Sequence, residues 1–174
     1  MMKQLTLVIL ILITTGACGM GRRAYLSATH KIVRNVTESM MPTIKPGNYL
    51  VIERDYYRTN PVRRFDIIIV KPPRMSGGPN GIESFLVKRV IALGGEKVEI
   101  HGGGLYVNGV ELKEPFPIVP HESSEEFAPF VVPPDEYFIL GDNRPNSEDS
   151  RYWDRRSIDK TYVVAKVTEI LPER

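Results

Sequence analysis

Short runs rich in β-branched and aromatic residues recur along most of this chain, and Gly, Pro, Asn or Asp residues separate them. Runs of this composition between turn-forming residues are typical of β-strands. The periodicity of a long amphipathic helix is missing beyond the amino-terminal residues. The pattern therefore predicts a mainly β domain, built as a coiled, barrel-like antiparallel sheet. The predicted strands span residues 49–53, 66–70, 85–93, 97–100, 105–107, 137–140 and 162–170.

The connections between these runs carry signals of their own. Asn108-Gly109 lies between two apolar residues and predicts a two-residue hairpin turn, because both positions of such a turn need positive φ angles. Three glycines at 102–104 predict another turn. Two proline-rich stretches, residues 72–81 and 115–134, are predicted to cross the surface as loops.

The amino terminus differs from the rest of the chain, because residues 4–21 carry no charge and begin with an apolar run. As a signal-anchor they would form a helix of about 27 Å, close to the roughly 30 Å hydrocarbon core of a bilayer. As a lipoprotein signal, the Gly-Ala-Cys18 sequence resembles a lipobox, and Cys18 would be acylated after cleavage. Both interpretations stay open here, and both predict a membrane-associated chain with its β domain on the extracytoplasmic side.

The predicted division is a membrane segment at 1–21, a juxtamembrane linker at 22–31 and one domain at 32–174. The last part is long enough to bury a core of its own. Cys18 is the sole cysteine, so no intramolecular disulfide is expected. A formal net charge of +2, without a basic run interleaved with aromatic residues, gives no support for nucleic-acid binding. We expect a monomer that contacts membrane lipid.

Candidate chemistry comes from two segments that contain Ser39 and Lys88. A serine hydroxyl is a weak nucleophile until a neighbouring base removes its proton, and a lysine can be that base when burial keeps it neutral. In a strand, Lys88 would share a face with Leu86, Val90 and Ala92, because successive side chains alternate. The opposite face of this run is also apolar, so Lys88 is predicted to lie in low dielectric. The two residues indicate a Ser-Lys peptidase.

A third segment, rich in Gly, Asp, Asn, Pro and Ser, follows a predicted strand near the end of the chain. This composition is typical of a surface loop, and the acidic spacing of an EF-hand calcium loop is missing. Asp142 and Asp149 are expected to hold Arg144 and Arg151 by bidentate bonds, which would make the loop rigid. Ser147 could then hydrogen-bond a neutral lysine amine and orient it.

The histidines offer other catalytic or metal-binding groups. His30, His101 and His121 lack the spacing of a metal-binding motif, so neither a metal nor a cofactor is predicted. A Ser-His-Asp triad stays open, because triad members come from distant positions in a sequence. Nothing in the sequence places a histidine beside Ser39.

Together the three segments resemble the motifs of the bacterial type I signal peptidases, peptidase family S26, and occur in that family's order. They are a serine box at 39–42, a Lys-Arg-Val box at 88–90 and a Gly-Asp-Asn-Arg box that extends over 141–151. The resemblance covers roughly residues 32 to 171. The chain departs from the family pattern at Phe65, where glycine is usual, among other positions.

The resemblance implies a serine endopeptidase that cleaves signal peptides from exported pre-proteins at the cytoplasmic membrane. Ser39 would be the nucleophile and Lys88 the general base. The Ser39 backbone N–H and the Thr37 hydroxyl would form the oxyanion hole. Met40 and Val87 would line shallow pockets for small residues before the cleaved bond. The residues that would support the site are Ser147, Asp142, Asp149 and Arg151.

Three other functions are compatible with parts of the sequence. A specialised relative that matures a pilin or a conjugation or secretion protein would share the same boxes. A self-cleaving repressor uses a similar Ser-Lys pair, but it needs a DNA-binding module and no membrane segment. A non-catalytic β-rich lipoprotein would explain Cys18 but not the combination of Ser39, Lys88 and the third segment.

Overall fold

The computed structural model describes residues 31–71 and 85–173. The predicted membrane segment with Cys18, residues 22–30 of the predicted linker and the loop predicted at 72–81 lie outside the described residues. Among the helices that the structure does describe, none is long and apolar enough to cross a membrane.

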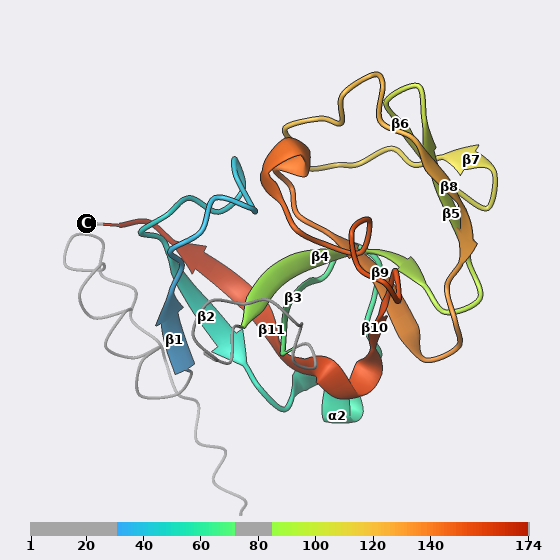
Figure 1. Ribbon diagram of the computed structural model, residues 1–174. Coiled ribbons are helices and arrows are strands. Elements are labelled where there is room, and N and C mark those ends of the chain that lie inside the picture. The colour runs from blue at the N-terminus through green and yellow to red at the C-terminus, as the bar shows by residue number, and fades with distance from the viewer. Residues whose placement is uncertain (1–30, 72–84, 174) are drawn as a thin grey trace, which may run out of the picture.

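The described residues form two antiparallel sheets, which Figure 1 shows with the smaller sheet at the upper right. The larger sheet has the strand order β1-β2-β11-β3-β4-β9-β10, and the smaller has the order β7-β6-β5-β8. The strands of the larger sheet are β1 (Lys31–Arg34), β2 (Tyr49–Glu53), β3 (Ile67–Val70), β4 (Leu86–Leu93), β9 (Glu136–Leu140), β10 (Ile158–Asp159) and β11 (Val163–Leu171). Those of the smaller sheet are β5 (Lys97–His101), β6 (Gly104–Val107), β7 (Val110–Glu111) and β8 (Phe127–Val131). The short helices are α2 (Tyr56–Thr59), η2 (Arg144–Asn146) and η3 (Lys160–Tyr162).

The prediction of mainly antiparallel β structure is confirmed, and every predicted strand is present with its ends shifted by no more than one residue. The β6–β7 hairpin turns at Asn108 and Gly109 with φ angles of 53° and 78°, as a two-residue turn requires. The barrel-like closure is not formed by the described residues. The larger sheet is open, with β1 and β10 at its edges.

One of the loop predictions was wrong: residues 127–131 were assigned to a surface loop and instead form β8, which pairs with β5. Pro129 argued against a strand because proline cannot donate to the hydrogen-bond ladder. The strand tolerates it because β8 lies at the edge of the smaller sheet and its register shifts between Val98 and Ile100 of β5. The sequence pattern also missed β1, whose four residues are too short a run for a signal and do not alternate between apolar and polar.

Three clusters of buried side chains form the core, and β4 contributes to each of them through buried or partly buried residues. A register shift between Val90 and Ala92 interrupts the pairing of β4 with β9. At this shift, Ile91 and Ala92 both pack in the cluster between the two sheets. Leu86 and Val90 instead belong to the cluster that contains Ile139 and Trp153. The predicted alternation therefore holds from Leu86 to Val90 but not for Ala92.

Candidate active site

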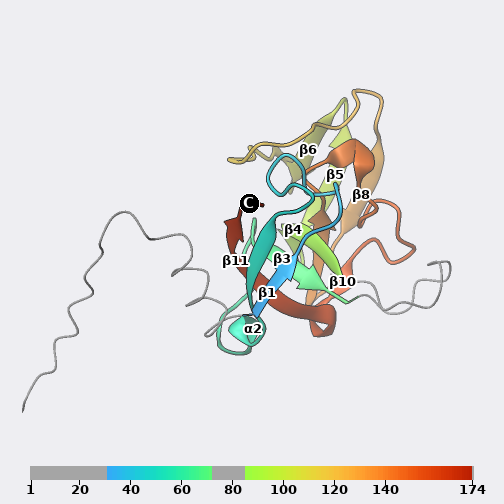
Figure 2. The ribbon, with the colours of Figure 1, turned by 90° about the vertical axis from the view of Figure 1, so that its left-hand side faces the viewer.

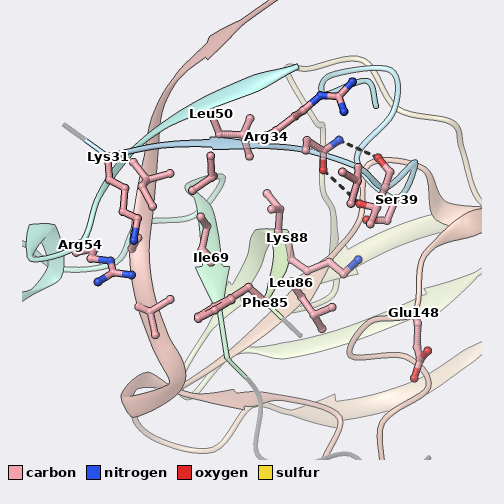
Figure 3. Close-up of a pocket in the computed structure, with 18 residues that line it drawn as sticks. Lys31, Arg34, Ser39, Leu50, Arg54, Ile69, Phe85, Leu86, Lys88 and Glu148 are labelled. Carbon is pink, nitrogen blue, oxygen red and sulfur yellow. Dashed lines mark hydrogen bonds between the residues drawn. The ribbon is translucent and has the colours of Figure 1, made fainter. Parts of the chain in front are cut away.

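A cavity of about 460 Å³ lies across one end of the larger sheet, beside β1 and β2, which face the viewer in Figure 2. Ser39 and Lys88 both line it, although 49 residues separate them in the sequence. Figure 3 shows the Lys88 amine directed toward the segment that carries Ser39. The apolar lining residues include Val33, Leu50, Ile52, Ile69, Leu86, Val87, Val164 and Ala165. The folded chain thus brings the two predicted reactive residues into one largely apolar cavity.

Lys88 lies on β4 opposite Ile68 of β3, and only 2% of its surface is exposed. Burial removes the ammonium from water and lowers the pKa of Lys88 to about 8, although the nearby Asp149 carboxylate opposes this shift. Among the described residues, its amine has no hydrogen-bond or ion-pair partner. A substantial fraction of this amine is therefore neutral near pH 8 and has a free lone pair.

Ser39 lies in a compact turn between β1 and β2. The backbone N–H groups of Met41 and Ile44 donate to the carbonyls of Glu38 and Met40, at 2.9 and 2.8 Å. The carbonyl of Ser39 accepts a hydrogen bond of 3.1 Å from the backbone N–H of Asn143, in the third motif. The turn is therefore fixed both internally and by the loop 141–151.

Thr37, the residue predicted to complete an oxyanion hole, also lines the cavity. Its hydroxyl donates to Asn35 Oδ1 at 3.3 Å, and Asn35 Nδ2 donates to the Thr37 carbonyl at 2.8 Å. Asn35 is buried and was not predicted from the sequence. Its two contacts hold Thr37 in place at the mouth of the cavity, and the long hydroxyl bond leaves that hydroxyl able to rotate.

The two predicted pocket residues occupy different environments. Val87 lines the cavity. Met40 is fully buried and is not among the residues that line the cavity, although it packs in the same core cluster as Leu50, which does line it. Its position inside the Ser39 turn directs the side chain beneath the turn, and an apolar side chain gains more from that burial than from exposure to a groove.

Of the two ion pairs predicted within the loop 141–151, the structure contains one and not the other. Asp149 accepts hydrogen bonds from Arg151 Nε and Nη2 at 2.8 and 2.9 Å, as predicted. The predicted pairing of Asp142 with Arg144 was wrong. Asp142 instead accepts from Nε and Nη2 of Arg89 at 2.8 and 2.6 Å, because Arg89 lies opposite Leu140, only two residues before Asp142.

Asp142 also connects the three motifs. Thr43, in the Ser39 turn, donates its hydroxyl to Asp142 Oδ2, while Arg89 reaches the same carboxylate from the residue next to Lys88. Arg89 additionally stacks on Phe116 at 3.7 Å and donates to the carbonyl of Phe65. Its presence beside Lys88 in an apolar strand was a signal that could have indicated a buried acidic partner.

Ser147 is buried, is not among the residues that line the cavity, and has no hydrogen bond to Lys88 in this structure. Its Oγ is a buried atom without a hydrogen-bond partner among the described residues. Gly141 lies between Ser147 and Ser39 and is in close contact with both. A Cβ at this position would collide with Ser147 Oγ and with the carbonyl oxygen of Ser39. A buried hydroxyl without a partner is costly, and such groups in native proteins often have a functional role.

Comparison with known proteins agrees with these motifs. A family model described as signal peptidase, peptidase S26, matches residues 3–171. A signal peptidase I of Leptolyngbya laminosa is 39% identical over 118 residues, which are 67% of this chain and 57% of that protein. A probable signal peptidase I-2 of Synechocystis is 34% identical over 142 residues, which are 82% of this chain and 62% of that protein. The chain thus spans about three fifths of the length of these two relatives.

A solved structure agrees as well. The crystal structure of a signal peptidase I from Enterococcus faecalis V583 matches with 33% sequence identity and a TM-score of 0.50. The match covers 63% of this chain and 98% of that one. With a family model that matches nearly all of its residues and relatives above 30% identity, this chain belongs to the signal peptidases of peptidase family S26.

Proposed function

We propose that this chain is a membrane-associated serine endopeptidase that removes signal peptides from exported pre-proteins, with Ser39 as nucleophile and Lys88 as general base. One observation carries the proposal: a lysine amine that is almost fully buried, with a pKa of about 8 and no ion-pair partner among the described residues, lines the same cavity as Ser39. Lysines with lowered pKa values are suited to act as bases near neutral pH.

In the first half of the reaction, Lys88 Nζ takes the proton from Ser39 Oγ while Oγ bonds to the carbonyl carbon of the substrate. The carbon–nitrogen bond then breaks, and Lys88 returns the proton to the leaving amine. In the second half, Lys88 takes a proton from water as the water oxygen attacks the acyl ester. That proton returns to Ser39 Oγ, so the enzyme ends as it began.

The negative charge on the attacked oxygen needs two donors at hydrogen-bond distance. We assign one to the backbone N–H of Ser39 and the other to the hydroxyl of Thr37. The long bond from Thr37 to Asn35 supports this role, because the hydroxyl can turn from Asn35 toward a stronger, charged acceptor. Ser147 would orient the Lys88 amine, and Asp142, Asp149 and Arg151 would hold the loop that carries Ser147.

The substrate side of the proposal is an extended peptide with small residues at the first and third positions before the cleaved bond. The mostly apolar cavity supports it, with Val87 in its wall. We further propose that residues 1–21 hold the chain at the cytoplasmic membrane, either as a signal-anchor or through acylated Cys18. Residues 22–31 would then be the linker of a monomer whose catalytic domain, residues 32–174, is extracytoplasmic.

The test is cleavage of a signal-peptide substrate by the full chain in mild detergent. Wild type should cleave it, and kcat/KM should rise with pH toward a plateau above about pH 8, because only neutral Lys88 can accept a proton. Ser39→Ala and Lys88→Arg should both be inactive, since arginine stays charged. Lys97→Arg, a change at an exposed lysine outside the cavity, is the matched control and should be fully active. Retained activity in Lys88→Arg would exclude Lys88 as the base.

A further inference from the structure

A buried polar cluster packs against the loop 141–151, none of its residues lines the cavity, and the proposed function gives a role to only one of them, Arg151. The connection between β7 and β8 supplies Glu114, His121 and Glu125, and the loop supplies Arg144 and Arg151. The same connection pairs with the loop through its backbone, because the N–H of residue 119 donates to the carbonyl of residue 142 and the N–H of residue 144 donates back to residue 119. This cluster joins the smaller sheet to the motif that contains Ser147.

The contacts of His121 fix its protonation state. Arg144 Nη1 lies 2.8 Å from His121 Nε2, and an arginine can only donate. Nε2 must therefore be the accepting nitrogen, and the ring proton lies on Nδ1, which donates to Glu125 Oε2 at 2.9 Å. Arg151 Nη1, 3.5 Å from Nδ1, directs its own hydrogen bond to Glu125 Oε1 at 2.8 Å. With a neutral ring, both nitrogens of His121 therefore have hydrogen-bond partners in the cluster.

A second proton on His121 would replace this acceptor by an N–H that faces the Arg144 guanidinium. The charges around the ring are Glu125, Arg144 and Arg151 in direct contact. Glu114 and Asp149 lie behind them, paired with Arg144 and Arg151 respectively. Burial is the main cause of a lowered pKa for His121, and the two arginines add to it, while Glu125 opposes it.

Arg144 transmits the state of His121 to the proposed active site. Its Nε donates to the carbonyl of Gly141 at 3.0 Å, and its own carbonyl accepts from Arg151 Nη2 at 2.7 Å. The same Arg151 Nη2 donates to the carbonyl of Ser147 at 3.3 Å. The carbonyls of Gly141, Arg144 and Ser147 are thus held by two arginines, and one of these, Arg144, donates to the accepting nitrogen of His121.

We propose that His121 is a positioning residue: its neutral ring holds Arg144, and its protonation releases the Ser147 loop and inactivates the enzyme. This inference rests on the proposed function, because Ser147 is assigned there to orient Lys88. According to this inference, two groups must be unprotonated for activity: Lys88 in the cavity and His121 in the connection between β7 and β8, outside the cavity.

The first experiment is the pH dependence of kcat/KM for the full chain in detergent, from about pH 9 down to the lowest pH at which the chain stays folded. If Lys88 alone must be unprotonated, kcat/KM falls tenfold for each pH unit below about pH 8. With His121 as a second group, the wild-type fall should steepen to a hundredfold per unit below the His121 pKa, which burial holds below its ordinary value. His121→Gln places an uncharged acceptor near the position of Nε2, so its fall should stay tenfold per unit throughout.

The matched control is His101→Gln, because His101 is an exposed histidine of β5 that stacks on Tyr106 at 4.0 Å, outside the cluster. It should keep the wild-type steepening. A wild-type profile that stays at tenfold per unit, or a steepening that His121→Gln retains, would overturn the inference.

The second experiment needs no turnover. Amide hydrogen exchange of residues 141–151, measured at neutral and acidic pH and corrected for the intrinsic pH dependence of exchange, should show lost protection in acidified wild type but not in His121→Gln. Equal protection of the two proteins at acidic pH would refute the role of His121. An absence of cleavage at every pH would refute the proposed function instead, and the exchange result would still decide whether His121 holds the loop.

Discussion

Two regions of the candidate site differ in how many partners their buried basic side chains have. The difference is clearest between two neighbouring residues of β4, Lys88 and Arg89. Lys88 and Arg89 are 2% and 5% exposed. Arg89, in the supporting region, donates to both oxygens of Asp142 and to the carbonyl of Phe65, and stacks on Phe116. Lys88, in the reactive region, has no such partner among the described residues.

The difference follows from the chemistry of the two side chains. An arginine stays charged in any protein environment, so it can be buried only with partners that compensate its charge. A lysine can lose its proton instead, and burial without a partner lowers its pKa. The buried arginines of the supporting region therefore make several hydrogen bonds each, while Lys88 and the Ser147 hydroxyl have no partner among the described residues.

The largest effect on stability is expected in the supporting region. Asp142→Asn removes the charge that compensates Arg89, and breaking a buried pair from one side costs about 3–5 kcal/mol of unfolding free energy. Urea denaturation followed by circular dichroism measures it. The matched control is Asp55→Asn at the Asp55–Arg58 pair, where both side chains are 79% exposed, and it should change stability by less than about 0.5 kcal/mol. If the two variants lost the same stability, the buried partner of Arg89 would be no more important than an exposed ion pair, and the proposed difference between the regions would be wrong.

A smaller change in the free energy of unfolding, this time an increase, is expected when Lys88 is replaced. The folded-state pKa of about 8 lies below the unfolded value of 10.5, so the folded protein binds fewer protons between these values and its stability rises with pH there. Lys88→Met keeps the shape without the charge. It should stabilise the fold at pH 7 by about 3 kcal/mol and by only about 1 kcal/mol at pH 10. Paired urea titrations at the two pH values measure the difference, and a destabilised variant would show that the ammonium is well compensated.

The smallest effect is expected at Ser147. Ser147→Ala removes a buried hydroxyl without a partner, so stability should stay the same or rise by up to about 1 kcal/mol, while peptide cleavage falls if Ser147 orients Lys88. Ser150→Ala is the control in the same loop, because Ser150 Oγ accepts from the backbone N–H of Ile139 at 3.0 Å. The control should lose about 1 kcal/mol. A loss of the same size in Ser147→Ala would show that this hydroxyl has a structural partner.

The strands could be predicted from sequence because their signals are local. Composition and turn residues located each of the seven predicted strands, and Asn108-Gly109 located the β6–β7 turn. β8 could not be found in this way, because its proline is acceptable only at an edge that pairing with β5 creates. The register shift at Ile91 is likewise a property of the pairing of β4 with β9 and is invisible in β4 alone.

The site was predictable to the extent that its chemistry needs particular residue types. The cavity contains Ser39 and Lys88 together, and Asp149 pairs with Arg151. The partner of Asp142 was not predictable from proximity in sequence, because a strand pairing brings Arg89 to it across 53 positions. Met40 shows a similar limit: its place in the core depends on how the turn packs and not on its distance from Ser39.

The order of strands in the larger sheet has a consequence for biosynthesis. β11 lies between β2, which follows the Ser39 turn, and β3, which pairs with the Lys88 strand β4. A ribosome makes residues 163–171 after both reactive residues, so the growing chain contains Ser39 and Lys88 long before it contains the strand that joins their halves of the sheet. Because a domain folds as a unit, we expect Ser39 and Lys88 to come together only after residues 163–171 have been made.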